Sequence, residues 1–375
     1  MKFLRRFLSA SAALLALATG LAATAKPPAP AEPGHTLAHA LLTLELEGTD
    51  APLLTQGLNQ LVEHAVARFG RPAAGELEPA TAARFFRQVD ESLVADGVIF
   101  PPAGRVELLR DALQPRQPAD DELQRTAMNF ANARRATSIA ALRRAGEPLY
   151  YFDCDLTAVL YVAVAERLAL PVFLVEAPDH NFVRWQSPGV SLNWDPNDGA
   201  AKSDQYFAQV AGITAEDRAT FGYLENRSPA RIQGYWLVRR GQRKAADGNA
   251  AGALADFREA VKTAPDDPAA ANELAWLLAT APDALVRNGR EAREMAEKLV
   301  ARSRRINWLE TLAAAWAETG DFPQAIAVEE EARRRAESWL QAAYRSDSLA
   351  GFDTTLAVYR QNLSYAAGKN AGLIK

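Results

Sequence analysis

The chain has 375 residues and a formal net charge of −4 at pH 7, and 49% of its residues are hydrophobic. This length is enough for two or three domains with substantial cores. The mildly acidic balance excludes a strongly basic surface, so we expect no nucleic-acid partner. The single cysteine, Cys154, excludes an intrachain disulfide bond.

The first 25 residues have the organisation of a cleaved signal peptide. Basic residues at positions 2, 5 and 6 precede an apolar run over 7–23, and Ala23-Thr24-Ala25 supplies small residues for cleavage. The run is short for a membrane span, so we expect no stable span after cleavage. We therefore predict a periplasmic or secreted protein that continues with a Pro-rich linker over 26–34. An uncleaved N-terminal anchor is the alternative.

Residues 35–145 are predicted to form a helical N-terminal region. Leucine, valine and phenylalanine residues recur there at helical spacing, and prolines interrupt the pattern. His35, His39 and His64 lack the neighbouring ligands of a metal site, so we expect no bound metal.

The segment 146–232 changes to a mixed pattern of helix and strands. Apolar positions over 156–168 predict a buried helix that starts near Cys154. Short apolar runs at 172–175, 182–185 and 190–194 predict strands. We expect a small antiparallel sheet packed on this helix, which places the chain in the α+β class.

The same segment contains the residue types that a thiol nucleophile requires. Cys154, His180 and Asp195 follow in this order, and an imidazole oriented by a carboxylate can take the proton of a thiol. A helix start lowers a thiol pKa, whereas the flanking Asp153 and Asp155 raise it. The alternative is a small core cysteine, a structural histidine and a turn carboxylate.

The middle segment resembles the transglutaminase-like superfamily, which has a papain-like fold. The likeness is closest to a bacterial subgroup of exported proteins that joins such a domain to tetratricopeptide repeats. The resemblance is carried by the sequence motifs YFDCDLTA (151–158), LYVA (160–163), APDH (177–180), FVRW (182–185) and LNWDP (192–196).

The resemblance implies a catalytic role for three residues. Cys154 would be the nucleophile, His180 the base and Asp195 the acid that orients the imidazole. Asn193 is the alternative third member, because papain-type sites use asparagine there.

Further residues line the implied site. Tyr150 or Tyr151 would donate to an oxyanion beside the Cys154 backbone N–H, or would pack in the core instead. Asp153, Asp155 and Trp194 are the other site-lining candidates. The two aspartates depart from the family pattern, which usually has Gly-x-Cys or a tryptophan close after the cysteine.

The part of the chain after 232 is predicted to be a helical solenoid. Small and aromatic residues recur with offsets of 12, 4, 3 and 5, which is the spacing of a tetratricopeptide helix–turn–helix: Gly241, Ala253, Phe257, Ala260 and Pro265. Two further units follow, and a capping helix with a frayed tail from Ala366 completes the chain.

The expected architecture is therefore N-terminal helices packed on a small transglutaminase-like, antiparallel-sheet domain, followed by an all-α tetratricopeptide solenoid. The predicted boundaries are 1–25 signal peptide, 26–34 linker, 35–145 helical region, 146–232 transglutaminase-like domain, 233–336 repeats, and 337–375 capping helix and tail.

Two functions follow from this organisation. The first is an exported cysteine enzyme that hydrolyses amides or peptides, or transfers acyl groups, through a thioester on Cys154. The second is an inactive transglutaminase-like scaffold that acts as a protein-interaction module. In either case we expect a protein or peptide in the repeat groove and no cofactor. Substrate and oligomeric state stay open.

Overall fold

The computed structural model describes residues 29–72, 77–101, 108–117, 132, 135–178, 180–342 and 349–374. The predicted signal peptide at 1–25 lies outside the described residues. The α+β class is confirmed, because helices accompany a four-stranded antiparallel sheet. The chain divides into two compact units, Met1–Ala230 and Arg231–Lys375, where the sequence predicts a boundary after 232.

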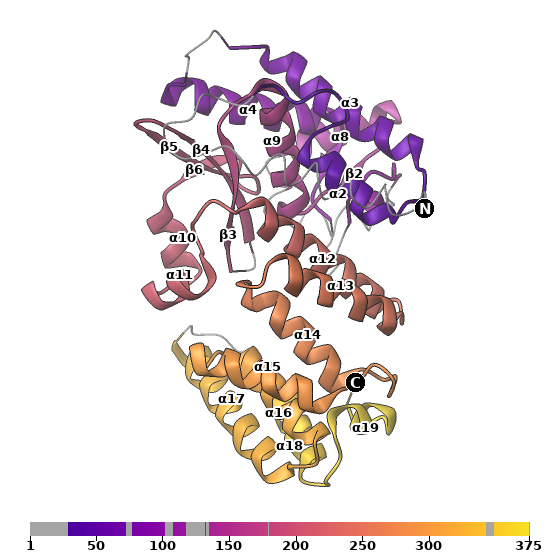
Figure 1. The fold of residues 1–375 in the computed structure, drawn as a ribbon. Coiled ribbons are helices and arrows are strands. Elements are labelled where there is room, and N and C mark those ends of the chain that lie inside the picture. Colours follow the sequence, from indigo (N-terminus) through magenta and orange to yellow (C-terminus); the bar gives the residue numbers. More distant parts are fainter. Residues whose placement is uncertain are drawn as a thin grey trace. The chain divides into compact units, whose positions relative to one another are not determined.

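The first unit contains all the described strands (Figure 1). Its elements are α2 (Leu37–Leu46), α3 (Pro52–Phe69), α4 (Pro79–Ala95), β1 (Val98–Ile99), α5 (Leu109–Ala112), α8 (Ala136–Ala145), β2 (Tyr150–Tyr151), α9 (Cys154–Leu168), β3 (Val172–Ala177), β4 (His180–Ser187), β5 (Val190–Asp195), β6 (Ala200–Lys202), α10 (Asp204–Val210) and α11 (Ala215–Phe221).

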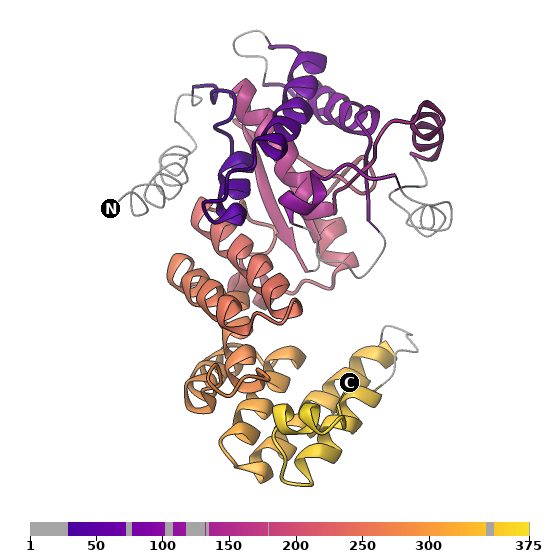
Figure 2. The same ribbon diagram turned by 90° about the vertical axis from the view of Figure 1, so that its right-hand side faces the viewer.

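The main sheet has the order β3-β4-β5-β6, with every pair antiparallel. One face packs on α9 and α4, where Trp194 stacks on Phe86 with ring centroids 5.6 Å apart (Figures 1 and 2). The opposite face carries Val175 and Phe182, and Phe182 stacks on Phe207 of α10 at 4.0 Å. Strand alternation therefore gives β4 and β5 two differently lined faces.

Helix α9 begins at Cys154 because Asp153 caps its N-terminus. The Asp153 carboxylate accepts a hydrogen bond of 3.0 Å from the backbone N–H of Leu156, as an N-cap aspartate does. The helix ends at Ala169, whose φ of 55° lies in the left-handed region. Its side chains are buried on most sides, since α2, α3, β3 and β4 all pack against it. The cap thus fixes Cys154 at the first helical position.

The region predicted to be wholly helical contains a short strand. β1 pairs in parallel with β2, in the register Val98↔Tyr150 and Ile99↔Tyr151. The preceding Gly97 has a φ of 82° and approaches the carbonyl of Pro148 so closely that a Cβ would lie 2.4 Å from its oxygen. A helix cannot continue through that residue, so the two β-branched residues pair as a strand instead.

The described part of the predicted linker, 29–34, is held against α9. The backbone N–H of Ala31 donates to the carbonyl of Glu166 at 2.9 Å, and Arg167 donates to the carbonyl of Ala31. Nearby, the N–H of Leu37 donates to the Glu166 carboxylate at 2.7 Å. These contacts were not predicted, because proline-rich composition indicates an extended chain without saying what it touches.

The second unit consists of helices that pack in consecutive pairs (Figures 1 and 2). They are α12 (Pro229–Ala246), α13 (Ala250–Thr263), α14 (Pro268–Thr280), α15 (Gly289–Arg302), α16 (Ile306–Glu318), α17 (Phe322–Ala342), α18 (Ala350–Tyr359) and α19 (Tyr365–Asn370).

The predicted frayed tail is wrong for most of its length. Residues 365–370 form α19, which packs against α14, α16 and α18. Ser364 caps this helix, and Ile374 beyond it is only 8% exposed. Gly368 lies so close to Val358 that a Cβ would meet its side chain at 2.6 Å. The small residues that resemble a flexible tail are what allow this close packing.

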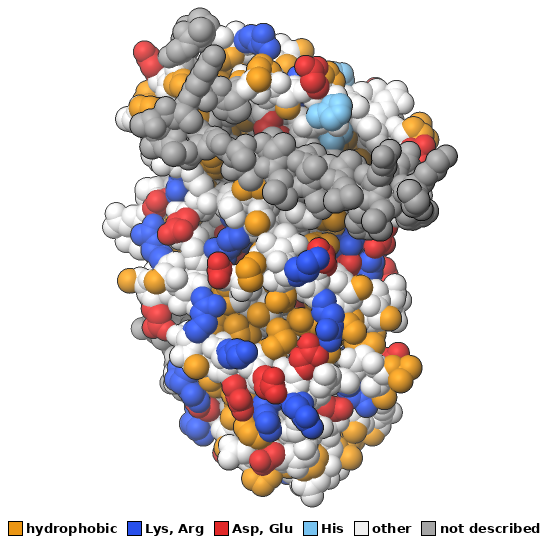
Figure 3. Space-filling view, in the orientation of Figure 1, with side chains coloured by type: hydrophobic (Ala, Val, Ile, Leu, Met, Phe, Trp, Pro, Cys, Tyr) orange, Lys and Arg blue, Asp and Glu red, His pale blue; other side chains and the backbone are white. Residues whose placement is uncertain are grey.

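Among the described residues, no helix is both long and apolar enough to cross a membrane. On the face drawn in Figure 3, basic and acidic side chains are interspersed over the helices of the second unit. Ion pairs also join helices of this unit, such as Arg258 with Glu291 at 3.0 Å.

Candidate functional site

His180 and Asp195 form a hydrogen-bonded pair at one end of the sheet. His180 is the first residue of β4 and Asp195 the last residue of β5, and these strands are antiparallel neighbours. The distance from His180 Nε2 to Asp195 Oδ1 is 3.1 Å. Both side chains are largely buried, and the His180 ring lies 5.9 Å from that of Phe207. Asp195 thus fixes one ring nitrogen and leaves Nδ1 for another partner.

The Asp195 carboxyl is held in its charged form. Burial raises its pKa, but the hydrogen bond from His180 and those from the backbone N–H groups of Asn197 and Asp198 outweigh burial, so the pKa is lowered overall. A charged carboxylate at this position can orient the imidazole and stabilise an imidazolium.

Cys154 lies beside the residue that follows His180. The backbone N–H of Asn181 donates to the Cys154 sulfur, and Cys154 Sγ lies 3.4 Å from Asp155 Oδ1. The same Asp155 oxygen accepts a 2.6 Å hydrogen bond from the Asn181 side chain. Asn181 therefore joins the start of α9 to the start of β4.

The thiol contacts the residue that follows His180 and, in the described structure, is not hydrogen-bonded to the imidazole itself. In the described part of the chain, the thiol contacts Asp155 and the backbone N–H of Asn181, whereas His180 pairs with Asp195. Successive strand residues point to opposite faces, so Asn181 faces α9 while His180 faces Phe207.

The resting thiol is neutral. Burial, and then the charges of Asp155 and Asp153, raise the pKa of the Cys154 thiol well above its ordinary value. The N–H of Asn181 acts in the opposite direction but does not offset them. The sequence leaves open whether the helix start lowers the thiol pKa more than the two aspartates raise it. In the structure the pKa is raised, and burial is the main cause.

Asn193, the alternative third member, belongs to a different network. Its side-chain oxygen accepts a 2.7 Å hydrogen bond from Arg184, and its amide donates to Asp204 at 2.7 Å. Arg184 and Asp204 are themselves paired at 2.5 Å. The described side-chain partners of Asn193 are thus Arg184 and Asp204, whereas the carboxylate that contacts His180 is that of Asp195.

The two tyrosines are not placed as oxyanion donors. Tyr151 is fully buried in a cluster with Ile99 and Leu149, under the guanidinium of Arg116. Burial and the charges of Asp96 and Glu147 raise the pKa of Tyr150, which places its ring near those residues. Both surroundings indicate packing.

The remaining two candidates also have structural contacts. Trp194 stacks on Phe86, on the face of β5 opposite to Asp195, and Asp153 caps α9. Both side chains therefore have structural roles, Trp194 in the core and Asp153 at the helix cap.

Sequence reasoning missed Asn181 and Arg135. Arg135 donates to Asp90 at 2.9 Å and to the carbonyl of Pro196 at 3.3 Å, which holds the loop directly after Asp195. Asn181 carried a signal, since it lies next to the candidate histidine. Arg135 lies 60 residues before Asp195 (195 − 135), so the spacing along the chain gave no indication that the two regions meet.

Within the parts of the chain that the structure describes, no group of three or more His, Cys, Asp and Glu residues is arranged to hold a metal ion. Comparison with protein-family models, with curated proteins and with solved structures finds no match for this chain.

Proposed function

We propose that the segment 146–232 is a transglutaminase-like domain, and that it catalyses amide or peptide hydrolysis, or acyl transfer, through a thioester on Cys154. The observation that carries this proposal is the 3.1 Å pair of His180 and Asp195 on adjacent strands, one residue from the backbone N–H that contacts the thiol. This is the chain order of such a site and the imidazole–carboxylate pairing that orients a general base.

The chemistry would proceed in two halves. Cys154 Sγ attacks the carbonyl carbon of an amide, and His180 Nδ1 takes the thiol proton. The C–N bond then breaks, and the imidazolium gives that proton to the leaving amine. Water or a second amine attacks the thioester, which releases the acid or a new amide and restores the thiol. Asp195 stays charged and stabilises the imidazolium in both halves.

The second candidate is the inactive scaffold. It is favoured by the raised pKa of the Cys154 thiol and by the separate hydrogen bonding of thiol and imidazole. In this reading, Cys154, Asp155 and Asn181 fasten α9 to the sheet, and the function lies in the second unit.

We also propose that α12–α17 are three tetratricopeptide units that bind a protein or peptide, and that the chain is exported to the periplasm or beyond. The close approach of Gly241 to the Phe257 ring supports the first proposal, because these are the small and aromatic positions of the repeat.

Acylation of Cys154 separates the two candidates. We would treat the protein with p-nitrophenyl acetate near neutral pH and follow the acetyl thioester by intact-protein mass spectrometry. If the site is active, His180→Ala should lower the acylation rate roughly 100-fold or more, because a positioned general base contributes about that much. Asp195→Asn should lose rate in the same direction.

The matched control is His64→Ala, because His64 is exposed and pairs with Asp96 away from the thiol. Cys154→Ala should form no adduct at this position. Equal acylation rates in the wild type, His180→Ala and His64→Ala would overturn the catalytic proposal and leave the scaffold.

A further inference from the structure

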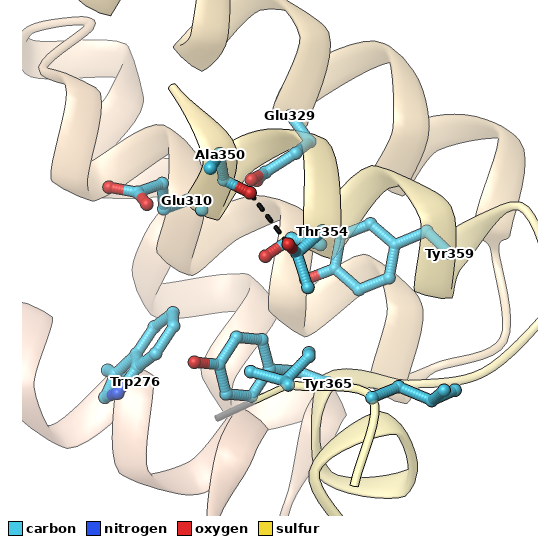
Figure 4. Close-up of a pocket in the computed structure, with 11 residues that line it drawn as sticks. Trp276, Glu310, Glu329, Ala350, Thr354, Tyr359 and Tyr365 are labelled. Carbon is cyan, nitrogen blue, oxygen red and sulfur yellow. Dashed lines mark hydrogen bonds between the residues drawn. The ribbon is translucent and has the colours of Figure 1, made fainter. Parts of the chain in front are cut away.

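The second unit contains a cavity of about 550 Å³ that the proposed chemistry does not use. Helices α14, α16, α17, α18 and α19 each contribute to it (Figure 4). Its wall combines aromatic rings and carboxylates: Trp276, Glu310, Glu329, Tyr359 and Tyr365 surround one space. A volume of this size is typical of small-molecule sites.

Two polar groups in the wall lack partners. Glu329 is 1% exposed and Tyr359 is 0% exposed. Glu329 Oε2 and the Tyr359 hydroxyl have no hydrogen-bond partner among the described residues. Buried polar groups are nearly always bonded, so each of these two points to a group that the cavity receives.

The described part of the cavity lining is acidic. Among the described residues, this lining has two glutamates and no lysine, arginine or histidine. The next residue on α17, Glu330, behaves differently, since it points outward and pairs with Arg360 at 3.0 Å. Within the described structure, the outer carboxylate of Glu330 thus has a counter-charge, and the two carboxylates of the cavity lining have none.

The aromatic rings suit a positive charge with an apolar body. Trp276 and Tyr365 pack edge to face with centroids 5.0 Å apart. Aromatic faces attract organic cations, and an alkyl chain gains from burial against the same rings. A metal ion would instead need several oxygen ligands around one point.

We propose that this cavity binds an alkylammonium ion, with its charge held by Glu329 and Glu310 and its alkyl part packed against the rings of Trp276 and Tyr365. The ammonium group supplies the donors that Glu329 Oε2 and the Tyr359 hydroxyl lack. The same chemistry is presented by a free alkylamine and by the side chain of a lysine.

Binding should release protons. Burial and the charge of Glu310 raise the pKa of Glu329 to about 8, and burial raises that of Glu310 to about 6. The other titratable groups that face Glu329 are Tyr359 on α18 and Tyr365 on α19, while α14 contributes the uncharged Trp276. An ammonium ion favours the charged carboxylates, so affinity should rise with pH.

The test is isothermal titration calorimetry of the full-length chain with n-butylamine, in an amine-free buffer. Butylamine stays charged over this range, so binding should be at least about tenfold tighter near pH 8.5 than near pH 5.5. Butan-1-ol, the uncharged isostere, should not bind. Nα-acetyl-lysine N-methylamide serves as the second arm: tighter binding than butylamine assigns the site to a lysine side chain, and weaker binding to a free amine.

Three isosteric variants locate the site. Glu329→Gln and Glu310→Gln should each weaken butylamine binding at least about tenfold, which corresponds to about 1.4 kcal/mol. Glu330→Gln on the same helix should bind as the wild type does. Equal binding of amine and alcohol would overturn the proposal. So would an unchanged affinity in both inner variants, with circular dichroism confirming their fold.

Discussion

At the residue scale, Cys154 shows how opposing effects on one thiol are resolved. A helix N-terminus stabilises a negative charge by about 0.3–1 kcal/mol at exposed sites. Burial of a charged group shifts its pKa by several units when desolvation is complete. Burial is the largest cause of the raised Cys154 pKa, the charge of Asp155 is the second largest, and the charge of Asp153 is the third. Position in the helix is therefore the smaller effect.

The first prediction separates the two aspartates. Asp155→Asn should lower the pKa of the Cys154 thiol and raise its iodoacetamide alkylation rate near pH 8 by about 3- to 10-fold, because removal of an adjacent charge shifts a pKa by up to about one unit. An asparagine oxygen still accepts the hydrogen bond from Asn181. Mass spectrometry of the alkylated protein measures the rate as a function of pH.

The matched variant is Asp153→Asn, which keeps the cap of α9 because asparagine caps as well as aspartate does. Its rate increase should be the smaller of the two. If Asp153→Asn raised the alkylation rate as much as Asp155→Asn or more, the conclusion that Asp155 raises the thiol pKa more than Asp153 would be contradicted.

At the element scale, close helix packing depends on single glycines. Gly241 of α12 lies against Phe257 of α13, where a Cβ would approach the ring to 2.4 Å. Arg240 and Asp256 form a buried pair beside it, with Nε to Oδ2 at 2.9 Å. The pair fixes the register of the two helices, so the ring has little freedom to withdraw.

The second prediction is that Gly241→Ala destabilises the second unit by about 1–3 kcal/mol, the usual cost of overpacking. A helical Gly→Ala change is otherwise favourable, so the sign itself is diagnostic. Urea unfolding followed by tryptophan fluorescence measures the change.

The control lies in the same unit. Gly351 is helical and has nothing within 4 Å of an added Cβ, so Gly351→Ala should leave the unfolding free energy unchanged or raise it. A Gly241→Ala variant as stable as Gly351→Ala would show that Phe257 relaxes freely.

At the scale of the whole molecule, each unit buries carboxyl groups that are neutral near pH 6. Burial raises the pKa of Glu166 in the first unit to about 7, and burial together with Glu310 raises that of Glu329 in the second to about 8. Between pH 4.5 and these values the folded protein holds protons that the unfolded chain has released. The free energy of unfolding therefore falls as pH rises through this window.

The third prediction follows from that sign. From about pH 5 to about pH 8, wild-type stability should fall by a few kcal/mol, since each pKa unit corresponds to about 1.4 kcal/mol. Glu329→Gln should flatten the pH dependence of the second unit, because glutamine does not ionise. Urea midpoints in amine-free buffer measure both.

Glu330→Gln is again the control, and it should keep the wild-type slope because Glu330 is partly exposed and paired. Asp195 acts in the opposite direction, because its pKa is lowered in the folded state. Its contribution is present above its ordinary value of 3.8 and is lost as pH falls through the folded value. If the free energy of unfolding of Glu329→Gln fell with pH as steeply as that of the wild type, the pH dependence could not be assigned to Glu329.

Much of the middle segment was predictable, because local patterns decide it. Apolar runs and the turn near 188 give the strands in their observed order, and the cap at Asp153 agrees with a helix start at Cys154. The pairing of His180 with Asp195 follows from one antiparallel register. Neither strand alone specifies which face its side chains take toward α9, and that is why the separate bonding of thiol and imidazole was not foreseen.

The sequence by itself determined the α+β class, the order of the elements and the residue types at the candidate site, since these follow from periodicity and spacing along the chain. Only the tertiary structure decided that desolvation and the flanking carboxylates keep the Cys154 thiol neutral, and that Asn193 accepts a hydrogen bond from Arg184. It alone also decided that the tail folds as α19 beside an acidic, aromatic cavity. The reason is physical: burial and charge pairing depend on groups brought together from distant parts of the chain, and local pattern does not record those distances.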